Sequence, residues 1–188
     1  MRPRYAVPHL LLLNGFPASG KSTLARRWVA DHALALALDV DRLRGQLGRW
    51  QDQPHAAGLA ARDLAAAMAR THLLAGHDVV VPQFLGRRAF VDRLQQTAQE
   101  VGATFHHVVL LDGREDAVRR FHARTGRAEE AAHAEAGRMV AESGGDQALH
   151  RMYDGLLEVV RECGPVTVLQ PLDGDVEGTY ARLRAALA

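Results

Sequence analysis

The stretch Gly15-Phe16-Pro17-Ala18-Ser19-Gly20-Lys21-Ser22-Thr23 decides the fold of this 188-residue chain. It fits the pattern G-x-x-x-x-G-K-[ST] at every fixed position. Lys21 is also the only lysine in the sequence, because 22 of the 23 Lys and Arg residues are arginine. A lysine carries a compact ammonium on a flexible stem, which in this pattern reaches the β- and γ-phosphates of a nucleotide. The stretch predicts a phosphate-binding loop, and a Gly-rich turn that matches by chance is the alternative.

The segments on either side of the loop have the character that such a loop requires. The apolar run Leu10–Leu13 is typical of a buried parallel strand, and residues 21–31 read as a helix. Glycines permit backbone conformations that let the loop amides point at an anion, next to a helix N-terminus. We expect Lys21 at a loop surface and the Ser22 hydroxyl on Mg²⁺. The expected nucleotide-binding residues of the loop are Gly15, Ala18, Ser19, Gly20, Lys21, Ser22 and Thr23.

Length and composition bound the class of protein. A chain of 188 residues predicts one domain, residues 1–188, with a full core. The net charge of +1 gives no bulk electrostatic case for binding nucleic acid. The single Cys163 excludes an internal disulfide and suits a reducing compartment. No apolar run approaches the roughly 20 residues that span a membrane, so the sequence predicts a cytoplasmic protein.

Apolar runs alternate with helical patterns along the chain, which predicts an α/β fold with a parallel sheet and helices on both faces. Leu59, Leu64 and Met68 recur near helical spacing and predict a helix in the Ala-rich segment. The expected strands are 10–14, 34–38, 79–81, 106–111 and 166–169. The expected helices are 21–31, 55–75, 87–101, 115–124, 128–142, 147–162 and 176–187.

Two acidic residues follow the second predicted strand, in Leu38-Asp39-Val40-Asp41-Arg42-Leu43-Arg44. Ligands of open parallel sheets bind beyond the carboxyl ends of the strands, so both acids are expected beside the phosphate loop. An extended backbone would put Asp39 and Asp41 on one side. One carboxylate can hold Mg²⁺ through water and the other can accept the proton of an attacking hydroxyl. Either residue can instead cap the following helix, and the two roles are compatible.

The two motifs together, Gly15–Thr23 and Leu38–Arg44, resemble the small P-loop kinases: chloramphenicol phosphotransferase, gluconate kinase, adenylylsulfate kinase and the zeta toxins. The resemblance implies a three-layer P-loop NTPase fold, with a five-stranded parallel sheet flanked by helices and a helical lid. It also implies ATP and Mg²⁺ as cofactors and Asp41 as the base for the acceptor hydroxyl. The sequence departs from many P-loop proteins at Gln83, where a Walker B aspartate is usual. The Mg²⁺ ligands are therefore expected to be Ser22 and Asp39.

An arginine cluster follows the fourth predicted strand, where the resembling kinases have their lid, here residues 119–146. Arg120 and Arg124 share a helix face, and we expect them, with Arg127, to neutralise the transferred phosphoryl group. A solvated basic helix is the alternative. Trp50 can stack on an acceptor ring or pack under a loop. The expected catalytic residues are Lys21, Asp41, Arg120 and Arg124, and the expected acceptor contacts are Asp41, Arg44, Gln83 and Arg87.

These features favour an ATP-dependent kinase that phosphorylates a hydroxyl of a small molecule such as a sugar, nucleoside or antibiotic. One alternative is a nucleotide-binding switch or ATPase without an acceptor. A guanine-selecting N-K-x-D motif is impossible in this chain, because Lys21 is its single lysine. Another alternative is a nucleic-acid end kinase, for which 5% aromatic residues and a net charge of +1 offer little support.

Overall fold

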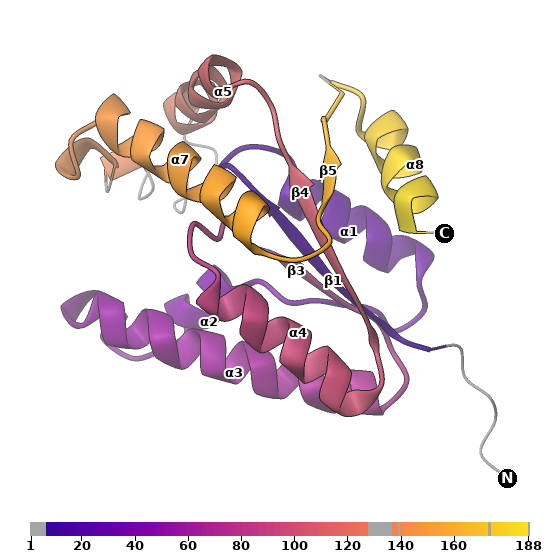
Figure 1. The fold of residues 1–188 in the computed structure, drawn as a ribbon. Helices are drawn as coiled ribbons and strands as arrows, with labels where there is room; N and C mark the ends of the chain where they lie inside the picture. The colour runs from indigo at the N-terminus through magenta and orange to yellow at the C-terminus, as the bar shows by residue number, and fades with distance from the viewer. Residues whose placement is uncertain (1–6, 128–136, 139, 173, 188) are drawn as a thin grey trace, which may run out of the picture.

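A parallel sheet of five strands forms the centre of the molecule, in the order β2-β3-β1-β4-β5 (Figure 1). The computed structural model describes residues 7–127, 137–138, 140–172 and 174–187. All four strand pairs are parallel, so the predicted α/β class and five-stranded sheet are confirmed. The strands are β1 (His9–Gly15), β2 (Leu36–Ala37), β3 (Val79–Pro82), β4 (Thr104–Leu110) and β5 (Thr167–Leu169).

Helices cover both faces of the sheet (Figure 1). α1 (Lys21–Asp31) and α8 (Val176–Leu187) pack on one face, and α3 (Pro54–Leu74) and α4 (Ala89–Val101) pack on the other. α5 (Arg114–Arg127) packs against α7 (Asp146–Glu162) at the carboxyl edge of the strands. A short helix, α2 (Val40–Gly45), and a 3-10 turn, η1 (Trp50–Asp52), join β2 to α3.

The leucine run of β1 explains why this strand is central. Leu10 and Leu12 point into the core under α3 and α4, whereas Leu11 and Leu13 point into the core under α1 and α8. All four side chains are fully buried. A strand with helices on both faces is apolar at every position, which is why the sequence shows no alternation here.

β2 is shorter than the predicted strand 34–38. Only Leu36 and Ala37 pair with β3. Leu34 has a left-handed backbone (φ 59°) and its side chain is 70% exposed, so it belongs to a turn rather than a strand. The apolar character of residues 34–38 therefore misled the prediction at its N-terminal end. The helix that Asp39 or Asp41 was expected to cap is α2, whose bounds were not predicted, and η1 was not predicted at all.

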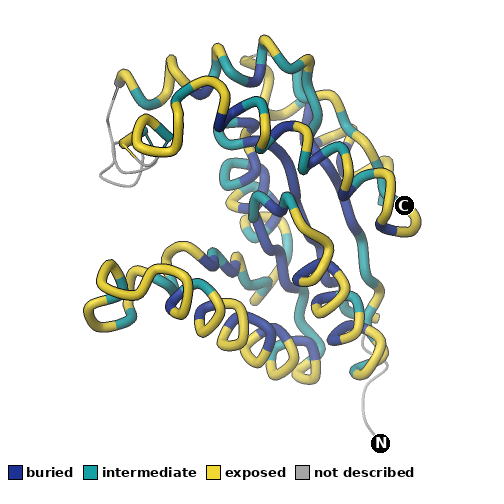
Figure 2. Tube along the Cα trace, turned by 60° about the vertical axis from the view of Figure 1, so that its left-hand side comes forward, coloured by how far each residue is buried: buried dark blue, intermediate teal, exposed yellow. Residues whose placement is uncertain are grey.

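The buried face of α3 consists mainly of alanines, together with Leu73. Ala61, Ala65 and Ala69 are completely buried, but Leu59, Leu64 and Met68 are 40–48% exposed. Small side chains let a helix approach its neighbours closely. The tube coloured by burial shows helices that are buried along one side and exposed along the other (Figure 2). The predicted helix is confirmed, and its buried face is formed by other residues than the three whose spacing indicated it.

Much of the predicted lid, residues 119–146, and of the predicted helix 128–142 lies outside the described residues. The described part of the lid comprises the second half of α5 and the residues just before α7. None of the helices in the described ranges is long and apolar enough to cross a membrane.

Candidate active site

The phosphate loop joins β1 to α1 at the carboxyl edge of the sheet. Gly15 (φ 150°) lies so close to β4 that a Cβ there would be 2.7 Å from the Leu110 carbonyl oxygen and 2.8 Å from Ser19 Oγ. The Ser19 amide donates to the Phe16 carbonyl over 3.2 Å, which closes the loop on itself. Gly20, left-handed at φ 93°, precedes α1 and has no side chain to cap it, which leaves the first amides of the helix to an anion. The loop has the geometry of an anion cradle.

The remaining predicted loop residues complete this turn. Ala18 is left-handed (φ 69°), an uncommon conformation for a residue with a side chain. Ser22 and Thr23 are half-buried in the first turn of α1. Their hydroxyls therefore lie at the helix N-terminus, where the helix dipole favours negative charge.

Lys21 is buried, contrary to the expectation that it lies at a loop surface. Its side chain is only 9% exposed. Lys21 Nζ donates to the Gly15 carbonyl over 2.9 Å and to the Phe16 carbonyl over 2.8 Å. The ammonium thus lies inside the curve of the loop, with its donors held by backbone oxygens.

Charges from α5 and from the start of α2 act on this ammonium. Burial, and to a smaller extent the positive charge of Arg124 in α5, lower the pKa of Lys21 to about 7. Asp41 and Asp39 act in the opposite sense. The structure therefore brings together the predicted lysine, both predicted carboxylates and one predicted lid arginine. A bound phosphate would add negative charge beside Lys21 and favour its charged form.

Asp39 caps α2. Its Oδ1 accepts from the Asp41 amide over 3.0 Å and from the Arg42 amide over 3.1 Å. The backbone becomes helical at Val40, so the extended geometry expected to align the two acids is wrong. The predicted capping role is confirmed for Asp39, and its second oxygen, Oδ2, is 3.8 Å from Arg42 Nε.

Asp41 lies in the first turn of α2 with a 59% exposed side chain. Asp41 Oδ2 accepts from Gln83 Nε2 over 3.3 Å. Asp41 Oδ1 is 3.5 Å from Arg44 Nη2. Two neighbours thus orient this carboxylate while leaving it open to solvent, as a group that receives a proton from a ligand requires.

Gln83 and Arg44 connect Asp41 to the surrounding structure. Gln83 follows β3, and its backbone N–H donates to the Leu13 carbonyl of β1 over 3.1 Å. The Arg44 guanidinium lies 4.7 Å from the centroid of the Trp50 ring, a cation–π contact. Gln83 Oε1 and Arg44 Nε are buried and have no hydrogen-bond partner within the described part of the chain. Unpaired buried polar atoms are costly, and a catalytic role or a bound water is among the explanations for them.

The other predicted arginines are in different environments. Arg120 Nη1 contacts Asp112 Oδ2 at 2.5 Å, an ion pair in which the Asp112 side chain is 6% exposed. Arg124 is exposed on α5, and its charge acts on Lys21. Arg127 ends α5, and its side chain lies outside what the structure describes. Arg87 is exposed in the segment between β3 and α4.

Asn14 is a site residue that the sequence analysis missed. It is fully buried at the end of β1. Asn14 Oδ1 accepts from the Gly15 amide over 2.8 Å and from the Leu85 amide over 2.9 Å, and Asn14 Nδ2 donates to the Leu85 carbonyl over 3.2 Å. The side chain thus ties the phosphate loop to the segment that carries Gln83. A single amide in an otherwise apolar strand was the available signal.

The predicted Mg²⁺ ligands have the right chemistry. Mg²⁺ prefers oxygen ligands and takes one or two carboxylates together with phosphate oxygens. The Ser22 hydroxyl and the Asp39 oxygen that accepts no amide, Oδ2, both fit this requirement. Among the described residues, no group of three or more His, Cys, Asp or Glu side chains could hold a metal ion.

Comparison with known proteins places this site in a family context. The sequence matches the model of an AAA domain family over residues 10–143. No curated protein matches the sequence. Among solved structures, the tunicamycin resistance protein of Deinococcus radiodurans is 15% identical with a TM-score of 0.62, over 97% of this chain and 96% of that one. A gluconokinase from Sinorhizobium meliloti is 19% identical with a TM-score of 0.57, over 96% of both chains.

A third similar structure contains ligands. The APS kinase CysC of Mycobacterium tuberculosis, in complex with AMPPNP and APS, is 17% identical with a TM-score of 0.60, over 96% of this chain and 98% of that one. At these identities the likeness is one of fold, and it confirms the predicted resemblance to the P-loop kinases at that level. The family match runs from β1 past the end of α5 and includes the phosphate loop, Asp41 and Gln83. The chain therefore belongs to the AAA domain family, on a P-loop kinase fold.

Proposed function

We propose that this protein is an ATP-dependent kinase that transfers the γ-phosphoryl group to a hydroxyl of a small molecule, such as a sugar, a nucleoside or an antibiotic. One observation carries the proposal. The exposed Asp41 carboxylate, oriented by Gln83 and Arg44, lies near enough to Lys21 to act on its pKa. A proton acceptor beside a phosphate site is what transfer to a hydroxyl requires. The kinase fold of the similar structures gives further support.

Residues of the loop would bind and position the nucleotide. ATP would supply the γ-phosphoryl group. The loop amides and the helix N-terminus would hold its phosphates, with Thr23 at the α-phosphate. Lys21 would exchange its contacts with the Gly15 and Phe16 carbonyls for phosphate oxygens. Phosphate oxygens are the better partners for an ammonium, because the hydrogen bonds are charge-assisted on both sides.

Asp41 would accept the proton of the acceptor hydroxyl. In that step the hydroxyl oxygen bonds to the γ-phosphorus, while the bond from phosphorus to the β–γ bridging oxygen breaks and its electron pair remains with ADP. Gln83 would hold the carboxylate in the correct orientation through its 3.3 Å hydrogen bond. The expected gain from such a base is about 10²-fold or more.

Ser22 and Asp39 would hold Mg²⁺, which neutralises phosphate charge when bound. Arg120, Arg124 and Arg127 would belong to the lid, residues 119–146. Arg124 is the best supported of the three, because its charge already acts on Lys21. Arg120 would have to exchange or share its contact with Asp112 to reach phosphate. Closure of the lid would exclude water from the transfer.

The test is a screen of ATP and Mg²⁺ against hydroxylated metabolites and antibiotics, with product mass as the readout. The proposal predicts a gain of one phosphoryl group on at least one small molecule, and a much slower gain with Lys21→Ala. ATP hydrolysis with every acceptor unmodified would contradict it in favour of an ATPase or switch. Phosphorylation of oligonucleotide ends alone would contradict it in favour of a nucleic-acid end kinase.

A further inference from the structure

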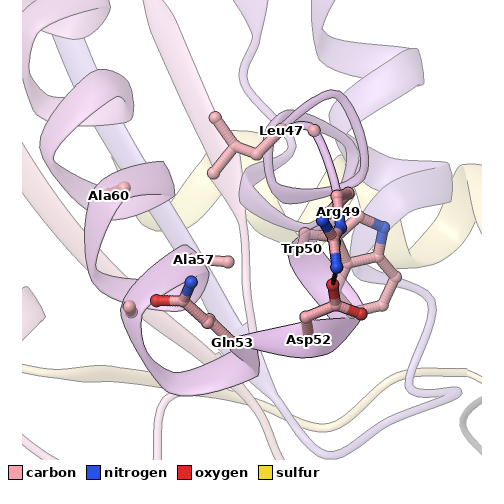
Figure 3. A pocket seen from close by; sticks show the side chains of 9 residues that line it. Leu47, Arg49, Trp50, Asp52, Gln53, Ala57 and Ala60 are labelled. Carbon is pink, nitrogen blue, oxygen red and sulfur yellow. Dashed lines mark hydrogen bonds and ion pairs between the residues drawn. The ribbon is translucent and has the colours of Figure 1, made fainter.

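A cavity of about 600 Å³ lies between the segment that joins α2 to α3 and the first turns of α3 (Figure 3). Leu47 and Trp50 line it from the joining segment, and Ala57 and Ala60 line it from α3. Its polar lining includes the amide of Gln53. The volume falls in the range of roughly 300–1,000 Å³ that is usual for small-molecule sites.

Local backbone geometry builds this cavity. Arg49 is left-handed (φ 54°), which is costly for a residue with a side chain and reverses the chain immediately before Trp50. Ala57 and Ala60 lie about one turn apart on α3, so their Cβ atoms form one wall of the space. Longer side chains at these positions would fill the space. The lining thus combines one large flat side chain with small ones opposite it.

Arg44 lies between the cavity lining and the proposed reaction centre. The Arg44 guanidinium lies 4.7 Å from the Trp50 ring centroid, and its Nη2 is 3.5 Å from Asp41 Oδ1. A single side chain therefore separates the cavity lining from the carboxylate that would receive the hydroxyl proton.

The charges around the cavity are balanced. Arg49 Nη2 contacts Asp52 Oδ2 at 2.6 Å, and this pair lies within the lining. Arg44 faces the Asp41 carboxylate and the Trp50 ring. Positive charge near the cavity is thus matched by carboxylates, which disfavours an anionic ligand. The Trp50 ring favours a flat ligand. The rest of the lining mixes alanines with Gln53 and the Arg49–Asp52 pair, which favours a ligand that is polar but uncharged.

We propose that this cavity binds the non-reacting part of the acceptor and selects an uncharged alcohol that carries a flat ring. The proposal rests on the kinase function proposed above, because it takes Asp41 as the place of the reacting hydroxyl. It predicts that a ring-bearing glycoside is a better ligand than the same sugar without the ring, and that an open-chain sugar acid is a poor one.

Trp50 allows binding to be measured without turnover. The chain has two tryptophans, Trp28 and Trp50, so Trp28→Phe leaves Trp50 as the only tryptophan and Trp50→Phe leaves Trp28. We expect phenyl β-glucoside, naphthyl β-glucoside or a nucleoside to change the fluorescence of Trp28→Phe saturably, at concentrations where glucose and gluconate do not. Trp50→Phe should show no such change, because Trp28 is 5% exposed under α8. Tighter binding of glucose or gluconate, or no response to any ring-bearing compound, would overturn the proposal.

Ala60→Leu tests the cavity from the wall opposite Arg44. Because leucine is a good helix former, the change should fill the space without unfolding α3, and it should raise the apparent Kd of the ring-bearing ligand about tenfold or more. Ala67→Leu is the matched control on the exposed side of the same helix and should leave the Kd unchanged. Equal affinity in the two variants would overturn the proposal. Binding without phosphoryl transfer would instead leave the cavity assignment standing and contradict the proposed kinase function.

Discussion

Acid should weaken the fold through His107, a buried histidine of β4 that lies beneath the phosphate loop. Its side chain is 4% exposed, and burial lowers its pKa from 6.5 to about 4. His107 Nε2 lies 3.5 Å from Asn14 Nδ2, an amide donor that suits a neutral ring. Neutral His107 is therefore part of the buried structure that supports Asn14 and the loop.

The sign and size of the effect follow from linkage. Well above pH 6.5 the His107 ring is neutral in both the folded and the unfolded protein, so it adds no pH dependence to the free energy of unfolding. Below pH 6.5 the unfolded chain takes up a proton that the folded protein rejects until about pH 4, so stability falls as the pH falls. Between pH 7.5 and pH 5.0 these two pKa values give a loss of about 2 kcal/mol from this residue.

Urea unfolding at pH 7.5 and pH 5.0, followed by circular dichroism, measures the loss. Carboxylates also titrate in this range and change the free energy of unfolding of every variant. The informative quantity is therefore the difference in this loss between the wild type and His107→Gln. We expect the wild type to lose about 2 kcal/mol more than His107→Gln, and His55→Gln, at an exposed position of α3, to behave as the wild type. Equal losses in the wild type and His107→Gln would refute the assignment of a buried neutral ring.

Three further predictions concern the proposed active site. Lys21→Ala should lower phosphoryl transfer by about 10²-fold or more while the circular dichroism spectrum is retained; near-wild-type transfer would count against the phosphate loop. Hydrogen exchange across residues 119–127 should slow when ATP, Mg²⁺ and acceptor are added together, since charge pairing with phosphate would order the lid; unchanged exchange would argue against a lid there. Asp39→Asn should raise the Mg²⁺ concentration needed for half-maximal rate and weaken the cap of α2; an unchanged Mg²⁺ requirement would remove Asp39 from the metal site.

Local signals in the sequence were sufficient for the central part of the fold. The run Leu10–Leu13, the glycine loop and the helix after it each have a strong local pattern, and the structure has all three in place. The alternation of apolar runs and helical segments predicted the parallel sheet, because strand and helix periods differ. The order of the strands required the three-dimensional structure.

The errors arose where tertiary packing overrides local pattern. In α3 the completely buried residues are Ala61, Ala65 and Ala69, which the spacing of the larger side chains did not reveal. Leu34 is apolar yet lies in a left-handed turn. Burial of Lys21 also could not be predicted, because its partners are backbone carbonyls whose positions depend on the loop conformation.

Site residues that belong to a local sequence motif could be predicted. Site contacts between segments that are distant in the sequence could not. The phosphate loop and the Asp39–Asp41 segment follow from local sequence, although the helical turn at Val40 gives the two acids separate surroundings. The contacts of Asn14 with Leu85 join residues 71 positions apart. The cavity beside Trp50 likewise depends on how α2 and α3 pack.

The most direct test of the proposed function is single-turnover phosphoryl transfer by Asp41→Asn, at saturating ATP and with the acceptor identified by product mass. Asparagine has nearly the shape of aspartate but cannot receive the proton in the same way. We predict a rate about 10²-fold or more below wild type, with nucleotide affinity little changed. Transfer at the wild-type rate would contradict the assignment of Asp41 as the base and leave it a residue of the first turn of α2.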